Sequence, residues 1–174
     1  ETGLILPLGE WILREACREA ASWPRHCQIA VNLSPAQFMH GDLVGLVHSI
    51  LVETGLSPGR LELEITEGVL IEDFERGLSL LRRLTSLGVR IAMDDFGSGY
   101  SSLTYLQAFP FDKIKIDRAF VTNLGRGPQS AAIVRAVIGL GHGLGVSIVV
   151  EGVENQQQLE FLVAEGCDVV QGYL

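Results

Sequence analysis

A chain of 174 residues is long enough to bury a core of its own. Hydrophobic residues make up 47% and charged residues 20%, which is typical of a globular protein and not of a disordered one. No apolar run approaches the ~20 residues of a membrane span. The net charge of −8 disfavours binding to duplex nucleic acid, because such binding depends on Lys and Arg contacts to phosphate.

The chain begins at Glu1, without a methionine, and ends at Leu174 directly after a strand-like run. We interpret both ends as cuts in a longer protein and residues 1–174 as one partial domain. Three cysteines, Cys17, Cys27 and Cys167, form no CxxC pair. This pattern favours a reducing compartment and so predicts a cytoplasmic domain, with a membrane tether elsewhere in the parent chain left open.

Apolar periodicity predicts helices and strands in alternation. The first six, in chain order, are a helix over 8–23, a strand over 29–31, a helix over 43–51 closed by Gly55, a strand over 61–65, a helix around 78–84 closed by Gly88, and a strand over 89–93. The next six are a short helix over 100–107, a strand over 113–116, a helix around 133–140, a strand over 147–150, a helix around 159–163 closed by Gly166, and a strand from 169. We expect Trp11 and Trp23 to pack against the barrel. Repeated βα units predict an α/β fold with a parallel sheet. Since a closed (β/α)8 barrel needs eight strands, we expect such a barrel lacking its first two.

Each predicted strand ends in a polar residue. The series is Asn32, Glu64, Asp94 with Asp95, Lys115, Glu151 and Gln171. In a parallel barrel the carboxyl ends of all strands open at one mouth, where barrel enzymes carry out their chemistry. Helix capping would explain any one of these positions, but capping prefers Asp, Asn and Ser and does not require Glu, Lys and Gln as well. The series therefore predicts a reaction centre.

The residue types in this series indicate a metal site. Carboxylates and an amide oxygen, with no convergent His or Cys, suit Mg²⁺ or Mn²⁺ and not zinc. The adjacent Asp94 and Asp95 would serve two ions about 4 Å apart, the separation typical of two-metal phosphoryl chemistry. Lys115 would place a positive charge near a phosphate or an attacking water. The loop over 96–102 holds two glycines and three hydroxyl side chains besides Tyr100, so its backbone N–H groups would approach an anion.

Six motifs along the whole chain resemble the EAL-domain cyclic di-GMP phosphodiesterases of bacteria. They are residues 31–34 (VNLS), 62–67 (ELEITE), 94–102 (DDFGSGYSS), 115–118 (KIDR), 151–154 (EGVE) and 171–173 (QGY). The resemblance implies a modified eight-stranded barrel in which one strand runs against the others. It also implies metal-dependent hydrolysis of one phosphodiester bond of cyclic di-GMP, a homodimer, and a sensor or GGDEF-type domain in the parent chain.

The resemblance also implies roles for individual residues. The metal ligands would be Asn32, Glu64, Asp94, Asp95 and Glu151, with Asp94 bridging two ions. Glu151 would hold the second metal or act as base on the attacking water, and Lys115 would orient that water. The residues that would line the ligand pocket are Ser34, Glu154 and Gln171. The segment that would couple the site to the dimer interface consists of Glu67 and the loop that includes Phe96, Gly97, Ser98 and Gly99.

This chain departs from the family pattern in three ways. The Glu-Ala-Leu motif that names the family, whose Glu is a metal ligand, does not occur in these residues, nor does the nearby arginine that holds a substrate phosphate. Ser98 stands where Thr is commoner. We therefore expect residues 1–174 by themselves to bind metal poorly and to expose two unpaired strand edges.

Two other functions fit parts of the sequence. An EAL-like domain that has lost catalysis would be a cyclic di-GMP receptor, and a Glu in the expected upstream motif would favour the enzyme over the receptor. An enolase-like lyase would use Lys115 as base and a metal ion to hold an enolate. The lyase is the weaker alternative, because the loop after Asp95 would have no role in it and the analogy rests on the fold.

Overall fold

The computed structural model describes residues 3–25, 27–97, 103–124 and 128–174. Within them, six strands form one sheet in chain order, and every neighbouring pair is parallel. The strands are β1 (Ile29–Asn32), β2 (Leu61–Thr66), β3 (Arg90–Phe96), β4 (Lys113–Ile116), β5 (Ser147–Val153) and β6 (Val169–Gly172). The helices are α1 (Ile5–Ala21), α2 (Pro35–Met39), α3 (Leu43–Thr54), α4 (Glu67–Glu72), α5 (Phe74–Ser86), α6 (Leu103–Ala108), α7 (Arg118–Thr122), α8 (Pro128–Leu144) and α9 (Gln156–Ala164), with a short 3-10 turn η1 (Pro58–Arg60).

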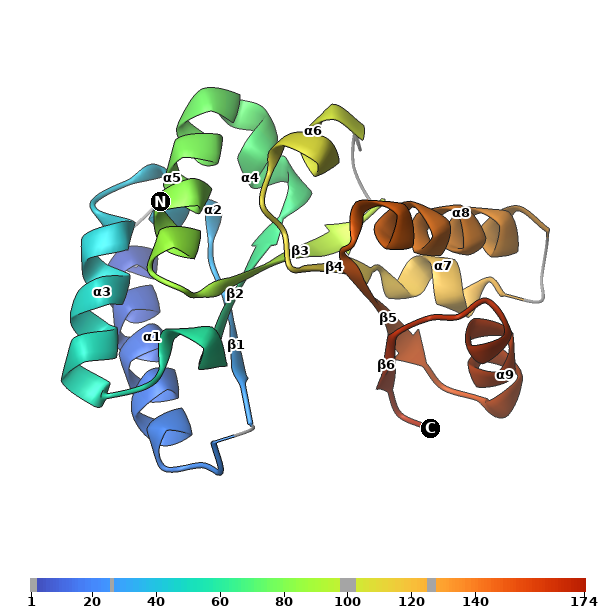
Figure 1. The fold of residues 1–174 in the computed structure, drawn as a ribbon, viewed down its shortest axis with the longest axis horizontal. Coiled ribbons are helices and arrows are strands. Elements are labelled where there is room, and N and C mark those ends of the chain that lie inside the picture. Colours follow the sequence, from blue (N-terminus) through green and yellow to red (C-terminus); the bar gives the residue numbers. More distant parts are fainter. Residues whose placement is uncertain (1–2, 26, 98–102, 125–127) are drawn as a thin grey trace.

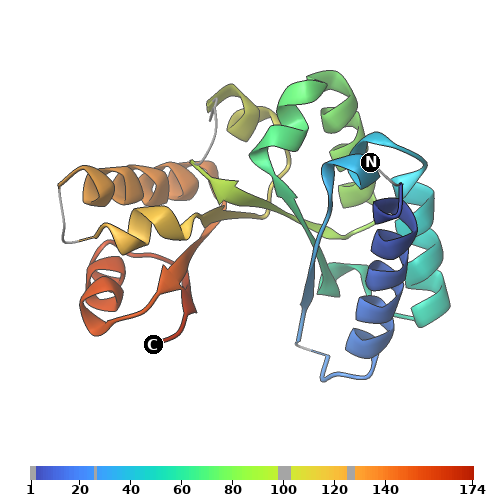
Figure 2. The same ribbon diagram turned by 180° about the vertical axis from the view of Figure 1, so that it is seen from behind.

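The sheet curls into part of a barrel. Figures 1 and 2 show α1, α3 and α5 beside the half that contains β1 and β2, and α7, α8 and α9 beside the half that contains β5 and β6. β1 and β6 are the edge strands of the described sheet. The predicted α/β architecture with parallel strands is therefore confirmed.

Strand alternation separates the apolar core from the site. On β2, Leu61, Leu63 and Ile65 are fully buried and belong to the core between sheet and helices. Glu62 and Glu64 alternate with them and therefore point to the opposite, inner face of the curled sheet. This alternation places charged side chains inside the barrel and apolar ones beneath the helices.

Predicted and observed elements agree best for the long, periodic segments. The strand predicted over 113–116 has the observed bounds, and Gly55 caps α3 with a φ of 69° as expected. Three short helices, α2, α4 and α7, were not predicted, because five or six residues are too few to display a helical apolar stripe. β3 and β5 continue past their predicted ends to Phe96 and Val153, so both include the polar residues that the sequence placed at strand ends.

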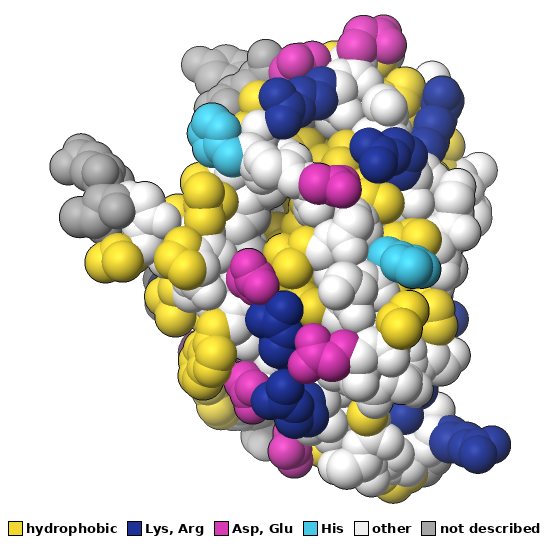
Figure 3. Space-filling model, turned by 90° about the vertical axis from the view of Figure 1, so that its left-hand side faces the viewer, with side chains coloured by type: hydrophobic (Ala, Val, Ile, Leu, Met, Phe, Trp, Pro, Cys, Tyr) yellow, Lys and Arg dark blue, Asp and Glu magenta, His cyan; other side chains and the backbone are white. Residues whose placement is uncertain are grey.

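Helix α1 buries one side and leaves an apolar second side exposed. The expectation that Trp11 packs against the barrel is wrong, since Trp11 is 58% exposed. The buried residues of α1 include Gly9 and Leu13, each two positions from Trp11, and two positions turn a helix by about 200°. Trp23 is partly buried against the core, as expected. Figure 3 shows this face, where acidic and basic side chains alternate beside apolar ones, in keeping with the ion pairs that Arg14 makes with Glu10 and Glu53.

None of the helices in the described ranges has the length and apolar character required to cross a bilayer.

Helix α8 approaches β5 closely at a glycine, and this contact gives a stability prediction. A Cβ built on Gly141 would lie 2.3 Å from Ile148 Cδ1 and 3.1 Å from the Val146 carbonyl oxygen. Because overpacking a core costs roughly 1–3 kcal/mol, Gly141→Ala should destabilise the fold by about that amount in urea unfolding. Gly139→Ala is the matched control: the same helix offers open space there, so Ala should stabilise by roughly 0.5–1 kcal/mol. Equal changes in the free energy of unfolding for the two substitutions would contradict the close contact of Gly141 with Ile148.

Candidate active site

The ammonium group of Lys115 is the centre of the cluster at the strand ends. Its Nζ contacts three carboxylate oxygens, lying 2.8 Å from Glu151 Oε1, 3.0 Å from Glu64 Oε1 and 3.1 Å from Asp94 Oδ1. An ammonium has three N–H donors, so these contacts use its full capacity. The Lys115 side chain is 9% exposed, and the carboxylates come from β2, β3 and β5 on both sides of β4. Strands far apart in sequence thus meet at one lysine.

Asn32 extends the cluster to the edge of the sheet. Its amide nitrogen donates to Glu64 Oε2 at 3.0 Å, so Glu64 links Asn32 on one side to Lys115 on the other. The backbone register brings Asn32 and Glu64 directly opposite each other on β1 and β2. The amide oxygen of Asn32 is the atom of this side chain that can bind a cation.

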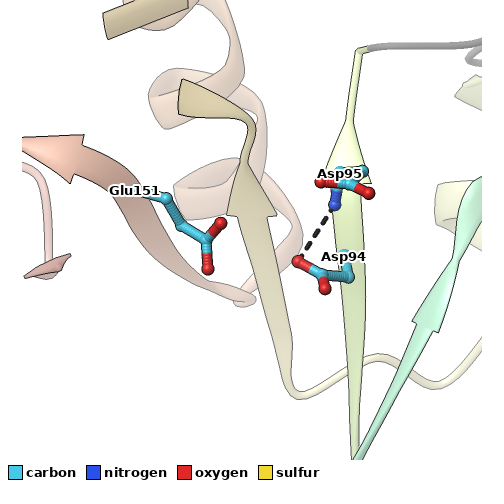
Figure 4. Close-up of side chains that lie close together, drawn as sticks. All are labelled: Asp94, Asp95 and Glu151. Carbon is cyan, nitrogen blue, oxygen red and sulfur yellow. Dashed lines mark hydrogen bonds between the residues drawn. The ribbon is translucent and has the colours of Figure 1, made fainter. Parts of the chain in front are cut away.

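Asp94, Asp95 and Glu151 form the part of the site that could hold a metal ion. Each offers one carboxylate oxygen, and these atoms lie within 4.8 Å of one another. Figure 4 shows Glu151 reaching from β5 toward the two aspartates on β3, and the backbone N–H of Asp95 donating to Asp94 Oδ1 at 3.1 Å. Asp95 has a φ of 54°, and the pairing of β3 with β4 shifts register between Met93 and Phe96. This irregularity lets two consecutive residues serve the same site.

The site raises the pKa of both Lys115 and Asp95, but for different reasons. Burial lowers the pKa of Lys115, but hydrogen bonds to Glu151, Glu64 and Asp94 outweigh it, so the pKa lies above its ordinary value and the lysine is charged. The pKa of Asp95 is raised, first by burial and then by the charge of Asp94, with Asp117 and Glu151 adding to the effect. One ammonium among four carboxylates leaves a strongly negative site, which favours the binding of divalent cations.

The raised pKa of Asp95 predicts that its charge destabilises the metal-free fold. Since the folded-state pKa lies above the unfolded value, stability falls as pH rises from the ordinary Asp pKa of about 3.9 through the folded pKa. Asp95→Asn removes the charge and suits a positive φ, so it should raise the free energy of unfolding in EDTA at pH 7 by about 1 kcal/mol. The gain should shrink toward pH 4, where Asp95 itself is increasingly neutral.

Asp73→Asn is the control for this measurement, because Asp73 caps α5 at an exposed position and Asn caps equally well. A loss of stability in Asp95→Asn, or a gain that does not vary with pH, would contradict the assignment.

Three predicted pocket residues lie outside the lysine cluster. The Ser34 hydroxyl accepts a hydrogen bond from the Gln37 backbone N–H and so caps α2. Glu154 is exposed, and its backbone N–H donates to Gln158 Oε1. Gln171 is exposed on β6 directly opposite Glu151. Their roles as ligand-binding residues stay predictions.

The predicted coupling segment is described only in part. Glu67 is 4% exposed at the first residue of α4, and Phe96 is 6% exposed at the end of β3. Gly97 has a φ of 93°, and a Cβ there would lie 2.8 Å from the Phe120 ring, so this position requires glycine. Ser98 and Gly99 lie outside the described residues. The coupling role stays a prediction.

Sequence reasoning missed two features close to the site. Asp117 caps α7 by accepting from the Ala119 N–H and also contributes to the raised pKa of Asp95. Lys113 and Glu62 form a second ion pair on the inner face, with 2.6 Å between Nζ and Oε1. The alternating pattern Glu62, Glu64 on one strand and Lys113, Lys115 on another was the signal that could have revealed this pair.

The fold and the site together define a partial parallel α/β barrel with a lysine-centred carboxylate cluster at the carboxyl ends of its strands. Residues 1–174 match the family model described as the EAL domain. The chain therefore belongs to the EAL domain family, and the resemblance carried by the six motifs is confirmed.

Relatives and solved structures agree with this assignment. A signaling protein of Caulobacter vibrioides described as uncharacterized is 58% identical over 99% of the chain and 21% of its own length. The bifunctional diguanylate cyclase/cyclic di-GMP phosphodiesterase MucR of Pseudomonas aeruginosa is 46% identical over 100% of the chain and 26% of its own length. The chain thus spans about a quarter or less of these curated relatives.

Among solved structures, the PaMucR phosphodiesterase in complex with c-di-GMP has a TM-score of 0.96 and 46% identity, over 99% of this chain and 72% of that one. Klebsiella pneumoniae BlrP1 in a manganese/cy-diGMP complex has a TM-score of 0.88 and 33% identity, over 97% of this chain and 43% of that one.

Proposed function

We propose that residues 1–174 belong to a domain that hydrolyses one phosphodiester bond of cyclic di-GMP and releases the linear dinucleotide. The observation that carries this proposal is the lysine-centred cluster, in which carboxylates from three strands and the amide of Asn32 converge. Membership of the EAL family supports it, because the related MucR phosphodiesterase was solved with c-di-GMP. We further propose that these residues act as one domain.

The donor set fits divalent cations that prefer oxygen. Asp94, Asp95 and Glu151 present carboxylate oxygens at mutual distances suited to one ion. Asn32 and Glu64, next to Asp94, would complete a second position. Hard oxygen ligands favour Mg²⁺ or Mn²⁺. Such a metal, when bound, lowers the pKa of a water molecule and neutralises charge on the phosphoryl oxygens.

The chain's own residues would position and deprotonate the attacking water. Glu151 would accept a proton from that water, and the Lys115 ammonium would orient it by exchanging one of its three carboxylate contacts for a hydrogen bond to the water. The water oxygen bonds to phosphorus while the opposite ester P–O bond breaks. One phosphodiester thus becomes a terminal phosphomonoester and a free hydroxyl, which opens the ring. Ser34, Glu154 and Gln171 would contact the dinucleotide around the cluster.

We also propose the setting in which the domain works. Glu67 with the loop from Phe96 to Gly99 would couple the site to a homodimer interface, and a sensor or GGDEF-type domain would occupy part of the remaining chain, as the name of the bifunctional relative MucR suggests. The absence of a disulfide among Cys17, Cys27 and Cys167 is consistent with a cytoplasmic location.

Product analysis tests the proposed activity. The full-length protein would be incubated with cyclic di-GMP and either Mn²⁺, Mg²⁺ or EDTA, and the nucleotides separated by chromatography with mass detection. We expect conversion to the linear dinucleotide with either metal and none in EDTA. Tight binding of cyclic di-GMP without conversion would show that the domain is a receptor and not an enzyme. Absence of both binding and conversion would refute the proposal.

A further inference from the structure

A second ion pair lies on the inner face of the sheet. On each of its two strands it is two residues before the residue that belongs to the proposed reaction centre. Lys113 Nζ is 2.6 Å from Glu62 Oε1, and the two side chains are 23% and 4% exposed. Glu62 is on β2 and Lys113 on β4, which are not neighbours, because β3 runs between them. On β3, Arg90 pairs with Glu62 and Ala92 pairs with Lys113, so the bridge crosses β3 diagonally between these two positions. The small side chain of Ala92 leaves room for the bridge to cross.

The reaction centre repeats this arrangement two residues further along both strands. Glu64 and Lys115 also join β2 to β4 across β3, with 3.0 Å between Oε1 and Nζ. Residues two apart on a strand share a face, so the two Glu–Lys bridges lie one above the other on the same side of the sheet. The Glu62–Lys113 pair therefore lies directly beneath the residues proposed to act in catalysis.

The β3–β4 pairing is irregular at the level of Lys115, whereas on its other side Lys115 pairs in register with Val149 of β5. The β3–β4 register proceeds through Ala92 with Lys113 and Met93 with Ile114, and then shifts before Phe96. The interruption coincides with the level of Lys115, so the ladder on the β3 side constrains that residue less than a regular ladder would. A side-chain bridge from β4 to β2 just before the interruption supplies a constraint across β3 that the β3–β4 pairing lacks there.

Stability does not account for this bridge. Glu62 Oε2 is buried and has no hydrogen-bond partner among the described residues. Burying a carboxylate oxygen without a partner costs free energy, and apolar pairs of similar volume commonly replace buried ion pairs without loss of stability. We propose that Glu62 and Lys113 form a positioning pair that fixes the spacing of β2 and β4 and thereby aligns Glu64 and Lys115 for metal binding and catalysis. The expected effect of this pair on the rate of hydrolysis rests on the proposed function, whereas its expected effect on metal affinity does not.

An apolar replacement separates positioning from stability. In the full-length protein, the double variant Glu62→Leu/Lys113→Met keeps the volume and removes the bridge, while Glu62→Gln keeps the shape and removes the charge. The readouts are the melting temperature, Mn²⁺ affinity by calorimetry, and kcat and KM for cyclic di-GMP. We expect an unchanged melting temperature for the double variant. For both variants we expect Mn²⁺ affinity and kcat to fall roughly tenfold to a hundredfold, with little change in KM.

The control is an ion pair far from the reaction centre. Arg135 and Glu165 join α8 to the end of α9, and Arg135→Gln/Glu165→Gln should leave Mn²⁺ affinity and kcat as in the wild type. Wild-type Mn²⁺ affinity in Glu62→Gln and in the double variant would overturn the inference, as would losses that occur only together with a lower melting temperature. If the wild-type protein binds Mn²⁺ but converts no cyclic di-GMP, the proposed function fails. The Mn²⁺ affinities of the two variants, compared with the wild type, still decide whether Glu62 and Lys113 have the positioning role.

Discussion

Lys115→Met should destabilise the metal-free protein and remove nearly all of the proposed cyclic di-GMP hydrolysis. The substitution keeps the length of the side chain but withdraws the ammonium that contacts Glu64, Asp94 and Glu151. Removing one partner of a buried ionic cluster leaves uncompensated charge and costs about 3 kcal/mol. For a domain of this size such a loss lowers the melting temperature by roughly 6–12 °C. Turnover should fall at least ~100-fold, because the attacking water loses the hydrogen bond that orients it.

Metal ions distinguish this explanation from general damage to the fold. Mn²⁺ neutralises the same carboxylates, so saturating Mn²⁺ should recover most of the lost melting temperature of Lys115→Met without recovering turnover. Arg82→Met is the matched control, because Arg82 is exposed on α5 and its loss changes the net charge equally. An unchanged melting temperature in EDTA, or a deficit that Mn²⁺ does not reduce, would contradict the lysine-centred cluster.

Glu151→Gln should abolish turnover while leaving the fold intact. Gln has the same shape and can still accept a hydrogen bond from Lys115, but it cannot accept a proton from water and is a weak metal ligand. Removing a general base costs typically 10²–10⁴-fold in rate, and the weakened metal site adds to this. We expect a loss of at least ~1,000-fold in kcat, with binding of cyclic di-GMP retained. Asp94→Asn should show a comparable loss, since Asp94 contacts both Lys115 and Asp95.

Glu160→Gln serves as the control for Glu151→Gln, because Glu160 is an exposed residue of α9 outside the cluster. Its kcat should match that of the wild type. Undiminished turnover in Glu151→Gln or in Asp94→Asn would exclude the proposed mechanism, whereas equal losses in Glu160→Gln would point to an effect of charge alone.

The sequence predicted the convergence at the strand ends because the repeat has a simple geometry. In a parallel sheet, residues one βα unit apart come to the same edge, so Asn32, Glu64, Asp94, Lys115 and Glu151 could be expected to meet without knowledge of any contact. The observed bonds of Lys115 and Asn32 agree with that expectation. Gln171 follows the same spacing but lies exposed on the edge strand β6.

Details that depend on irregular backbone or on contacts across a strand could not be predicted. Nothing in the sequence distinguishes the positive φ of Asp95 from an ordinary strand residue, because Asp tolerates both. The Glu62–Lys113 bridge joins two strands that are not neighbours and passes over a third strand, in which Arg90 pairs with Glu62 and Ala92 with Lys113. Trp11 was misplaced because apolar residues occur on both sides of α1, so composition did not reveal which side faces the core.

The location of bound metal tests the central claim most directly. Crystals of the full-length protein with Mn²⁺ and cyclic di-GMP would be measured at the manganese absorption edge, where anomalous scattering locates each ion. We predict a manganese ion bound by Asp94, Asp95 and Glu151, with a phosphate of the dinucleotide next to it. Manganese bound elsewhere, or cyclic di-GMP bound away from these three carboxylates, would contradict the account.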